Sequence, residues 1–259
     1  MIIVVTYQWA PDPQEATVAA DGTVDFSRAK PQISDYDATA IEVGRALADA
    51  TGARLVGVSV TGGAGAAPVA TKAALARGLD EVLVVSDPRL EGAGTTMTAT
   101  AIAAAVRSLG EVSLVLTGDS SIDNGAKMVA GVLGGVLGWP VLTDVTAVRF
   151  VGEGLEAVRV VPQGVQTMAV TAPAVIATAA DAAKPKAPGM KDVLAAGKKP
   201  VRIMTADEAG VVIRAEGVLR STGRAPAPAR RMVRIDTSDP ASAGAELVSS
   251  LRAAGVWGG

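Results

Sequence analysis

The 259-residue sequence contains no cysteine and no histidine. These absences exclude thiol nucleophiles, disulfides, histidine general bases, zinc sites built on thiolate or imidazole, and thiolate-bound iron–sulfur clusters. Aromatic residues make up 3% of the chain, which leaves few side chains for stacking with single-stranded nucleic acid, and the formal net charge of −2 indicates no basic nucleic-acid surface. The remaining carboxylates, amines, hydroxyls and backbone groups suit binding and positioning of a ligand better than covalent catalysis.

Long apolar runs of the kind that cross a membrane are also missing. Residues 128–143 and 160–180 lack charge, but the first contains four glycines and Pro140, and the second contains prolines, glutamines and threonines. We therefore expect no membrane insertion. The amino terminus begins with a strand-like segment and no basic region, so we expect no signal or transit peptide and a cytoplasmic protein.

What the chain does contain is an alternation of β-branched runs and alanine-rich segments. It predicts strands at 2–6, 54–60, 81–87 and 112–118, and helices at 35–52, 67–78, 95–110 and up to about 137. A hairpin is expected over residues 16–27 with Asp21-Gly22 at its turn. The alternation predicts an α/β fold: a mainly parallel sheet flanked by helices, Rossmann-like, with the loops that follow the strands gathered at one edge, where ligands bind.

The pattern changes after Pro140. Residues 143–180 predict a short meander that ends in a core strand at 174–179, and residues 181–200 are rich in lysine, proline and alanine and are expected to be exposed. A strand-like segment (211–220), a proline- and arginine-rich linker (224–231) and a terminal helix (240–255) follow. They hold too few large apolar residues for a core of their own, so we expect an extended arm that wraps around a partner chain.

The segment TGDSSIDNGAKMVAG, residues 117–131, is the strongest candidate for a ligand site. It follows a buried strand and precedes a helix, where free N–H groups and the helix dipole favour an anion. Its polar side chains suit ribose hydroxyls: Asp119, Ser120, Ser121 and Asp123. Lys127 is placed to approach an anion. The alternative is structural, with Asp123 or Asn124 simply capping the helix. The P-loop and the dinucleotide glycine pattern are both absent.

Two other loops are predicted at the same edge. VTGGAG, residues 60–65, allows close approach of a ligand to the backbone. In QISDYDATAIE, residues 32–42, Ser34 and Asp35 are candidate helix caps, and Tyr36 and Asp37 begin the helix. Ser34 with Asp37 partly fits a capping box.

Taken together, residues 20–47, 59–85, 115–145, 172–201 and 235–256 resemble the electron-transfer flavoprotein beta subunit. The resemblance is closest to the branch encoded beside bacterial fixation- and carnitine-type operons, and it covers nearly the whole chain in order. It implies an electron-carrier subunit rather than an enzyme, in an obligate heterodimer with an alpha subunit that holds most of a redox FAD. Electrons would pass between a partner dehydrogenase and an acceptor such as a quinone reductase.

The resemblance also implies a division of the chain and a set of ligand contacts. Residues 1–180 would form the adenine-nucleotide-binding α/β domain, 181–200 a partner-recognition loop, and 201–259 an arm around the alpha subunit. The beta subunit would carry AMP or, in bifurcating members, its own second FAD, and Tyr36 would lie near the flavin ring. By matching position the contacts are Thr6, Ser34, Asp35, Tyr36, Asp37, Thr61, Gly62, Gly118, Asp119, Ser120, Ser121, Ile122, Asp123, Lys127, Met128 and Val129.

The sequence departs from the family pattern in three places. The phosphate turn, which in the family carries Gln and Thr or Val before a glycine, reads Lys127-Met128-Val129-Ala130 here. Gln8 replaces a frequent lysine. Ala182-Ala183 replaces an expected leucine anchor, for which Met190 or Leu194 are candidate substitutes.

Two rival interpretations fall outside the family. A stand-alone adenine-nucleotide-binding module has a glycine pattern that is not met after Gly118. An adenylating enzyme needs a pyrophosphate loop after the first strand, where this chain reads TYQWAPDP, residues 6–13.

Overall fold

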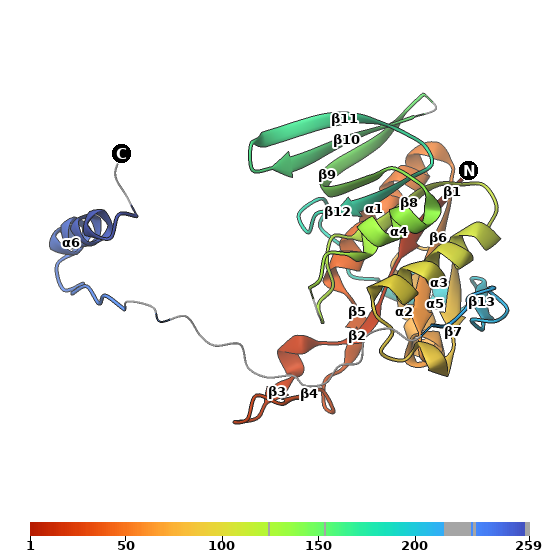
Figure 1. Ribbon diagram of the computed structural model, residues 1–259, viewed down its shortest axis with the longest axis horizontal. Coiled ribbons are helices and arrows are strands. Elements are labelled where there is room, and N and C mark those ends of the chain that lie inside the picture. Colours follow the sequence, from red (N-terminus) through yellow and green to blue (C-terminus); the bar gives the residue numbers. More distant parts are fainter. Residues whose placement is uncertain (124, 153, 215–228, 230–231, 257–259) are drawn as a thin grey trace. The chain divides into compact units, whose positions relative to one another are not determined.

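The computed structural model describes residues 1–123, 125–152, 154–214, 229 and 232–256 (Figure 1). The chain forms two compact units, Met1–Thr222 and Gly223–Gly259. The strand expected over 211–220 is wrong for residues 211–214, which form no strand. The remainder of that segment, and the linker expected at 224–231 apart from Ala229, lie outside the described residues.

The first unit is built on a nine-stranded sheet in the order β11-β10-β9-β12-β8-β1-β6-β7-β13 (Figure 1). Its strands are β1 (Ile2–Thr6), β6 (Arg54–Thr61), β7 (Glu81–Ser86), β8 (Val112–Gly118), β9 (Val141–Val151), β10 (Gly154–Val161), β11 (Gly164–Thr171), β12 (Ala174–Thr178) and β13 (Val201–Met204). Pairings are parallel from β9 through β12, β8, β1, β6 and β7 to β13, and antiparallel within the β9-β10-β11 meander. The predicted mainly parallel α/β sheet is confirmed, as is the meander that leads into a core strand.

Helices cover both faces of the parallel strands. α1 (Asp35–Thr51), α2 (Pro68–Ala76) and α5 (Met190–Ala196) contribute to one apolar core, and α3 (Thr95–Ser108) and α4 (Val129–Leu137) contribute to the other. Ile3 and Val5 of β1 face the first core, and Val4 faces the second. Burial on both faces explains why these strands are continuous apolar runs rather than alternating ones. No helix in the described residues combines the length and apolar character required to cross a bilayer.

The strand order reverses beside β1. The chain builds β6 and β7 on one side of β1, then crosses to place β8 and β12 on the other side. At such a reversal the loops after the two central strands diverge and leave a crevice at their carboxyl ends, which is where α/β sheets bind ligands. The topology therefore places a site after β1 and β8.

Two small sheets lie near the amino terminus. β3 (Thr17–Val18) pairs with β4 (Val24–Asp25) and confirms the predicted hairpin, whose turn contains Gly22 at a φ of 89°. β2 (Trp9–Pro11) pairs with β5 (Pro31–Ile33) and was not predicted. Short 3₁₀ turns complete the unit: η1 (Pro13–Glu15), η2 (Ala64–Ala66) and η3 (Pro88–Leu90).

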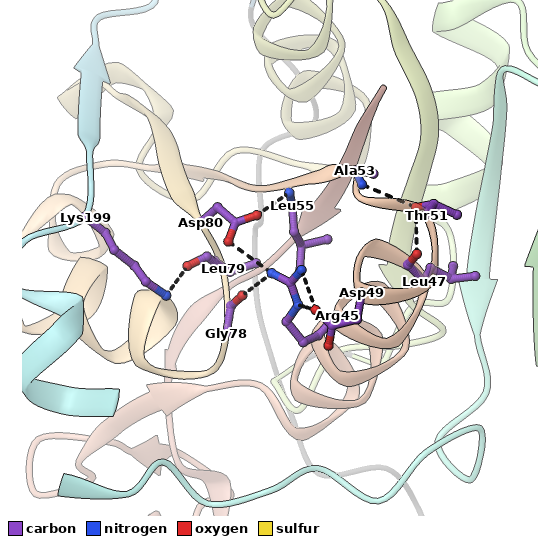
Figure 2. A network of polar contacts seen from close by, with 10 residues as sticks. All are labelled: Arg45, Leu47, Asp49, Thr51, Ala53, Leu55, Gly78, Leu79, Asp80 and Lys199. Atoms are coloured by element: carbon purple, nitrogen blue, oxygen red, sulfur yellow. Dashed lines mark hydrogen bonds and ion pairs between the residues drawn. The ribbon is translucent and has the colours of Figure 1, made fainter. Parts of the chain in front are cut away.

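The segment between β12 and β13 is attached to the helices of the first core. The Lys199 ammonium donates to the carbonyl oxygens of Leu79, at 2.6 Å, and Leu75, at 3.1 Å. These carbonyls lie at the carboxyl end of α2, where a cation is favoured. Figure 2 also shows a second cation, Arg45, which donates to the Gly78 carbonyl at 3.1 Å and to the Asp80 carboxylate at 3.0 Å. Neither α5 nor β13 was predicted, and the contacts of Lys199, which lies between them, attach this segment to α2.

The second unit contains one helix in its described part, α6 (Pro240–Ala253). Asp239 caps it by accepting from the backbone N–H groups of Ala241 and Ser242. No residue of α6 is buried, as expected for a tail that lacks a core. The predicted terminal helix is confirmed.

Lys199→Met should destabilise the first unit, because two helix-end carbonyls lose a charged donor. We expect the free energy of unfolding to fall by about 1–3 kcal/mol, the range for hydrogen bonds from charged groups. Denaturant unfolding of the full chain measures the effect. The exposed neighbour provides the control, and Lys198→Met should lie close to the wild type. Equal stability of the two variants would contradict the assigned role of Lys199.

Candidate functional site

A cavity of about 560 Å³ opens at the carboxyl ends of β1, β6 and β8, at the predicted edge of the sheet. The loops after these three strands form most of its wall, and η3 and the start of α3 complete it. Such a volume lies within the range of small-molecule and cofactor sites. The position matches the crevice that the strand order predicts.

Most of the predicted site residues line this cavity. They are Thr6, Asp37, Thr61, Gly62, Gly118, Asp119, Ser120, Ser121, Asp123, Lys127, Met128 and Val129. Four others do not: Ser34, Asp35, Tyr36 and Ile122. The lining also includes residues that were not predicted as contacts, among them Tyr7, Gln8, Trp9 and Glu91. Their position directly after β1 or after β7 was the available signal, since these loops end at the same edge.

Asp37 joins the loops after β1 and β8. Its carboxylate accepts a hydrogen bond from the Gln8 backbone N–H at 2.8 Å, and the Gly118 backbone also donates to it. The contact requires glycine at position 118, because a Cβ there would lie 2.7 Å from Asp37 Oδ1 and 2.8 Å from the carbonyl carbon of Tyr36. Tyr36 is thereby packed against Gly118, half-buried beside the cavity.

The capping box expected from Ser34 and Asp37 is wrong. α1 does have Ser34 at its N-cap, but the Ser34 side chain makes no capping hydrogen bond. Its Oγ is buried and has no hydrogen-bond partner among the described residues. The Asp37 carboxylate instead accepts hydrogen bonds from the Gln8 and Gly118 backbone, so it does not make the hydrogen bond that a capping box requires.

Burial raises the pKa of Asp37 to about 7. Removal from water disfavours the charged carboxylate, and the nearby Asp123 adds to the increase. The hydrogen bonds from Gln8 and Gly118 act in the opposite direction. A group that titrates near neutral pH therefore lines the cavity.

The loop after β8 does not carry a side-chain cap for α4. That helix begins at Val129, with Met128 at the N-cap and no capping side chain. The interpretation of Asp123 as a cap is therefore wrong, and Asn124 lies outside the described residues. Asp123 instead accepts a hydrogen bond from Gln8 Nε2 at 2.7 Å, which links the same two loops that Asp37 joins.

The loop after β6 is closed against η3. The Thr61 hydroxyl oxygen accepts hydrogen bonds from the backbone N–H groups of Gly63, at 3.1 Å, and Gly65, at 3.0 Å. Gly62 lies so close to Glu91 that a Cβ would come within 1.9 Å of the Glu91 carboxylate. The predicted glycine-rich loop is thus used for a close contact between two loops of the protein, which brings a carboxylate to the cavity wall.

Lys127 is engaged by carboxylates. Its ammonium bonds to Asp119, and it lies 3.9 Å from Asp144 Oδ1. The Asp119 side chain is 8% exposed and that of Lys127 is 56% exposed, so the pair lies at the boundary between the cavity wall and solvent. The contact with Asp119 raises the pKa of Lys127, which therefore stays charged.

The cavity wall carries more acidic than basic side chains. Among the described residues that line it, Lys127 is the one cation, and the acids are Asp37, Glu91, Asp119 and Asp123. Carboxylates and hydroxyls accept hydrogen bonds from sugar hydroxyls and amino groups. The arrangement suits a polar ligand rich in donors.

Comparison with known proteins adds a family to this geometry. Residues 21–209 match the family model described as the electron transfer flavoprotein domain. The match covers well over half of the chain. It includes the loops after β6, β7 and β8, and it begins after the Thr6–Pro11 part of the cavity wall.

Asp37→Asn should change how stability depends on pH. The folded pKa of about 7 lies above the ordinary 3.8, so the folded chain keeps a proton that the unfolded chain releases. The contribution of this carboxyl to stability is therefore present below about pH 4 and is lost as pH rises through about 7. Relative to the wild type, the variant should gain about 1–3 kcal/mol between about pH 5 and about pH 8.

Denaturant unfolding at a series of pH values measures this difference. Asp35→Asn is the matched control, because Asp35 is an exposed neighbour at the start of the same helix. The stability difference between Asp37→Asn and this control should grow between about pH 5 and about pH 8. A curve for Asp37→Asn that runs parallel to that of the wild type would show that Asp37 does not titrate as described.

Proposed function

The chain belongs to the electron transfer flavoprotein family, and on this basis we propose that it is the beta subunit of a heterodimeric electron-transfer flavoprotein. Members of this family are flavoproteins that carry electrons and work with partner subunits and dehydrogenases. In the proposed role the chain acts in the cytoplasm as an electron-carrier subunit. It helps an alpha subunit to hold FAD, and electrons pass between a dehydrogenase and an acceptor such as a quinone reductase.

The observation that carries this proposal is the cavity at the reversal of strand order. Its volume of about 560 Å³ is sufficient for an adenine ligand, the chemical part that AMP and FAD share. The side chains of Asp37, Asp119, Ser120 and Asp123 supply the acceptors and donors that ribose hydroxyls need. The adenosine part of either molecule fits these residues.

FAD, when bound, supplies the redox chemistry, and the protein supplies orientation and electrostatics. Tyr36 is held beside the cavity by the close contact at Gly118, which supports its proposed position next to the flavin. This close contact matters because an aromatic ring keeps a defined distance to a cofactor only if the backbone that carries it is held in place.

Residues 181–200 are the proposed site for redox partners. Met190 is 78% exposed and Leu194 is 69% exposed, and the two are four residues apart on α5, hence on one face. They form an exposed apolar pair on a helix that Lys199 helps to fix. We propose this pair as the anchor that the sequence lacks at Ala182-Ala183. The arm proposed to wrap the alpha subunit is residues 201–259, and its first strand, β13, pairs with β7 in the main sheet.

Co-expression with an alpha-type subunit tests the proposed function. We expect a yellow heterodimer from which acid extraction releases one FAD together with an adenine compound from the cavity. Two FAD molecules per heterodimer would identify a bifurcating beta subunit. A colourless chain that stays stable alone and binds only an adenine ligand would instead identify a stand-alone nucleotide-binding module and contradict the proposal.

Gly118→Ala should reduce the amount of adenine compound that co-purifies, by about tenfold or more, because the added methyl group displaces Asp37 from the cavity wall. Chromatography of the acid extract measures it. Gly131→Ala is the control, since a Cβ at that α4 position meets nothing within 4 Å. Equal adenine content in both variants would place the ligand elsewhere.

A further inference from the structure

The end of the cavity next to α4 contains an internal ion pair. Asp119 is 8% exposed, and its backbone N–H donates to the Thr178 carbonyl of β12 at 3.0 Å. The carboxylate is therefore fixed on the sheet. Lys127 bonds to it from a residue at a φ of 53°, a left-handed conformation that a non-glycine residue adopts only at some cost.

The positive charge of Lys127 is already balanced. Besides Asp119, Asp144 lies 3.9 Å away, and Asp123 belongs to the same loop as Lys127. A phosphate that approached Lys127 would share the ammonium with Asp119 and would meet the negative charge of Asp119 and Asp144. Met128, which follows Lys127, adds an apolar side chain with no donor. At this end of the cavity the described side chains therefore offer a phosphate no cation that is not already paired.

The same carboxylates favour an uncharged sugar. Ribose hydroxyls donate hydrogen bonds to carboxylates without adding charge, and charge-assisted hydrogen bonds are the stronger ones. The cavity wall therefore interacts differently with the nucleoside part and with the phosphate part of an adenine nucleotide. Its carboxylates can accept hydrogen bonds from ribose hydroxyls, and their negative charge opposes a phosphate.

From this geometry we propose that Asp119 determines ligand specificity: by holding Lys127, it makes the cavity bind an unphosphorylated nucleoside more tightly than the corresponding nucleotide. The inference rests on the proposed adenine-ligand role of the cavity. It narrows that role to a ligand class, because the chain itself supplies no unpaired cation on the described cavity wall for a phosphate.

Calorimetric titration of the full-length chain, freed of bound nucleotide, with adenosine and with AMP tests the proposal. The wild type should bind adenosine more tightly than AMP. Asp119→Asn keeps the shape of the side chain and releases Lys127, so it should tighten AMP binding by about tenfold, or about 1.4 kcal/mol, and leave adenosine within about threefold. Adding Lys127→Met to Asp119→Asn should remove that gain.

Glu91→Gln is the matched control, because it also removes one negative charge from the cavity wall but leaves Lys127 paired. It should change the ratio of AMP to adenosine affinity much less than Asp119→Asn does.

The outcomes distinguish a failure of the proposed ligand specificity from a failure of the proposed adenine site. Tighter AMP than adenosine binding by the wild type, or an unchanged ratio in Asp119→Asn, overturns the inference and leaves the proposed function standing. Absence of binding of both ligands by the wild type and all variants overturns the inference together with the proposed adenine site.

Discussion

The site depends on one buried carboxylate. Asp37 accepts hydrogen bonds from the backbone of Gln8 and of Gly118, and it thereby joins the loops that diverge where the strand order reverses. Without a side chain at position 118 the two loops can approach closely, and the wall of the cavity follows from that approach. The cost is a carboxyl group largely removed from water, with a pKa near neutrality. Stability and the geometry of the cavity are therefore coupled through this residue.

Most of the sheet could be predicted from the sequence, because buried parallel strands and their covering helices leave strong periodic signals. The run at 112–118 and the helix that ends near Leu137 are examples. Elements that depend on tertiary contacts could not be predicted. β13 has four residues, three of them exposed, and its strand pairing with β7 and the contacts of Lys199 are its main supports. The β2-β5 pair could not be predicted either, because strands of three residues are too short to show a periodic pattern.

The candidate site was predicted in position but not in detail. A loop after a parallel strand points to a ligand edge, so Gly118 to Val129 could be found from the sequence. The partners of its charged residues could not, since Gln8 and Asp123 are far apart in the chain and meet only because β1 and β8 are neighbours. The same holds for the role of Lys127. Its charge predicts an anion ligand, whereas the fold places Asp119 there.

The central claim is that the cavity between these loops holds the adenosine part of a ligand in a two-chain flavoprotein. A crystal structure of the chain purified together with its alpha-type subunit tests it most directly. The account predicts ligand density in contact with Asp37 and Ser120, with FAD at the junction of the two chains near Tyr36. An empty cavity beside a fully loaded FAD that makes no contact with this chain would contradict it.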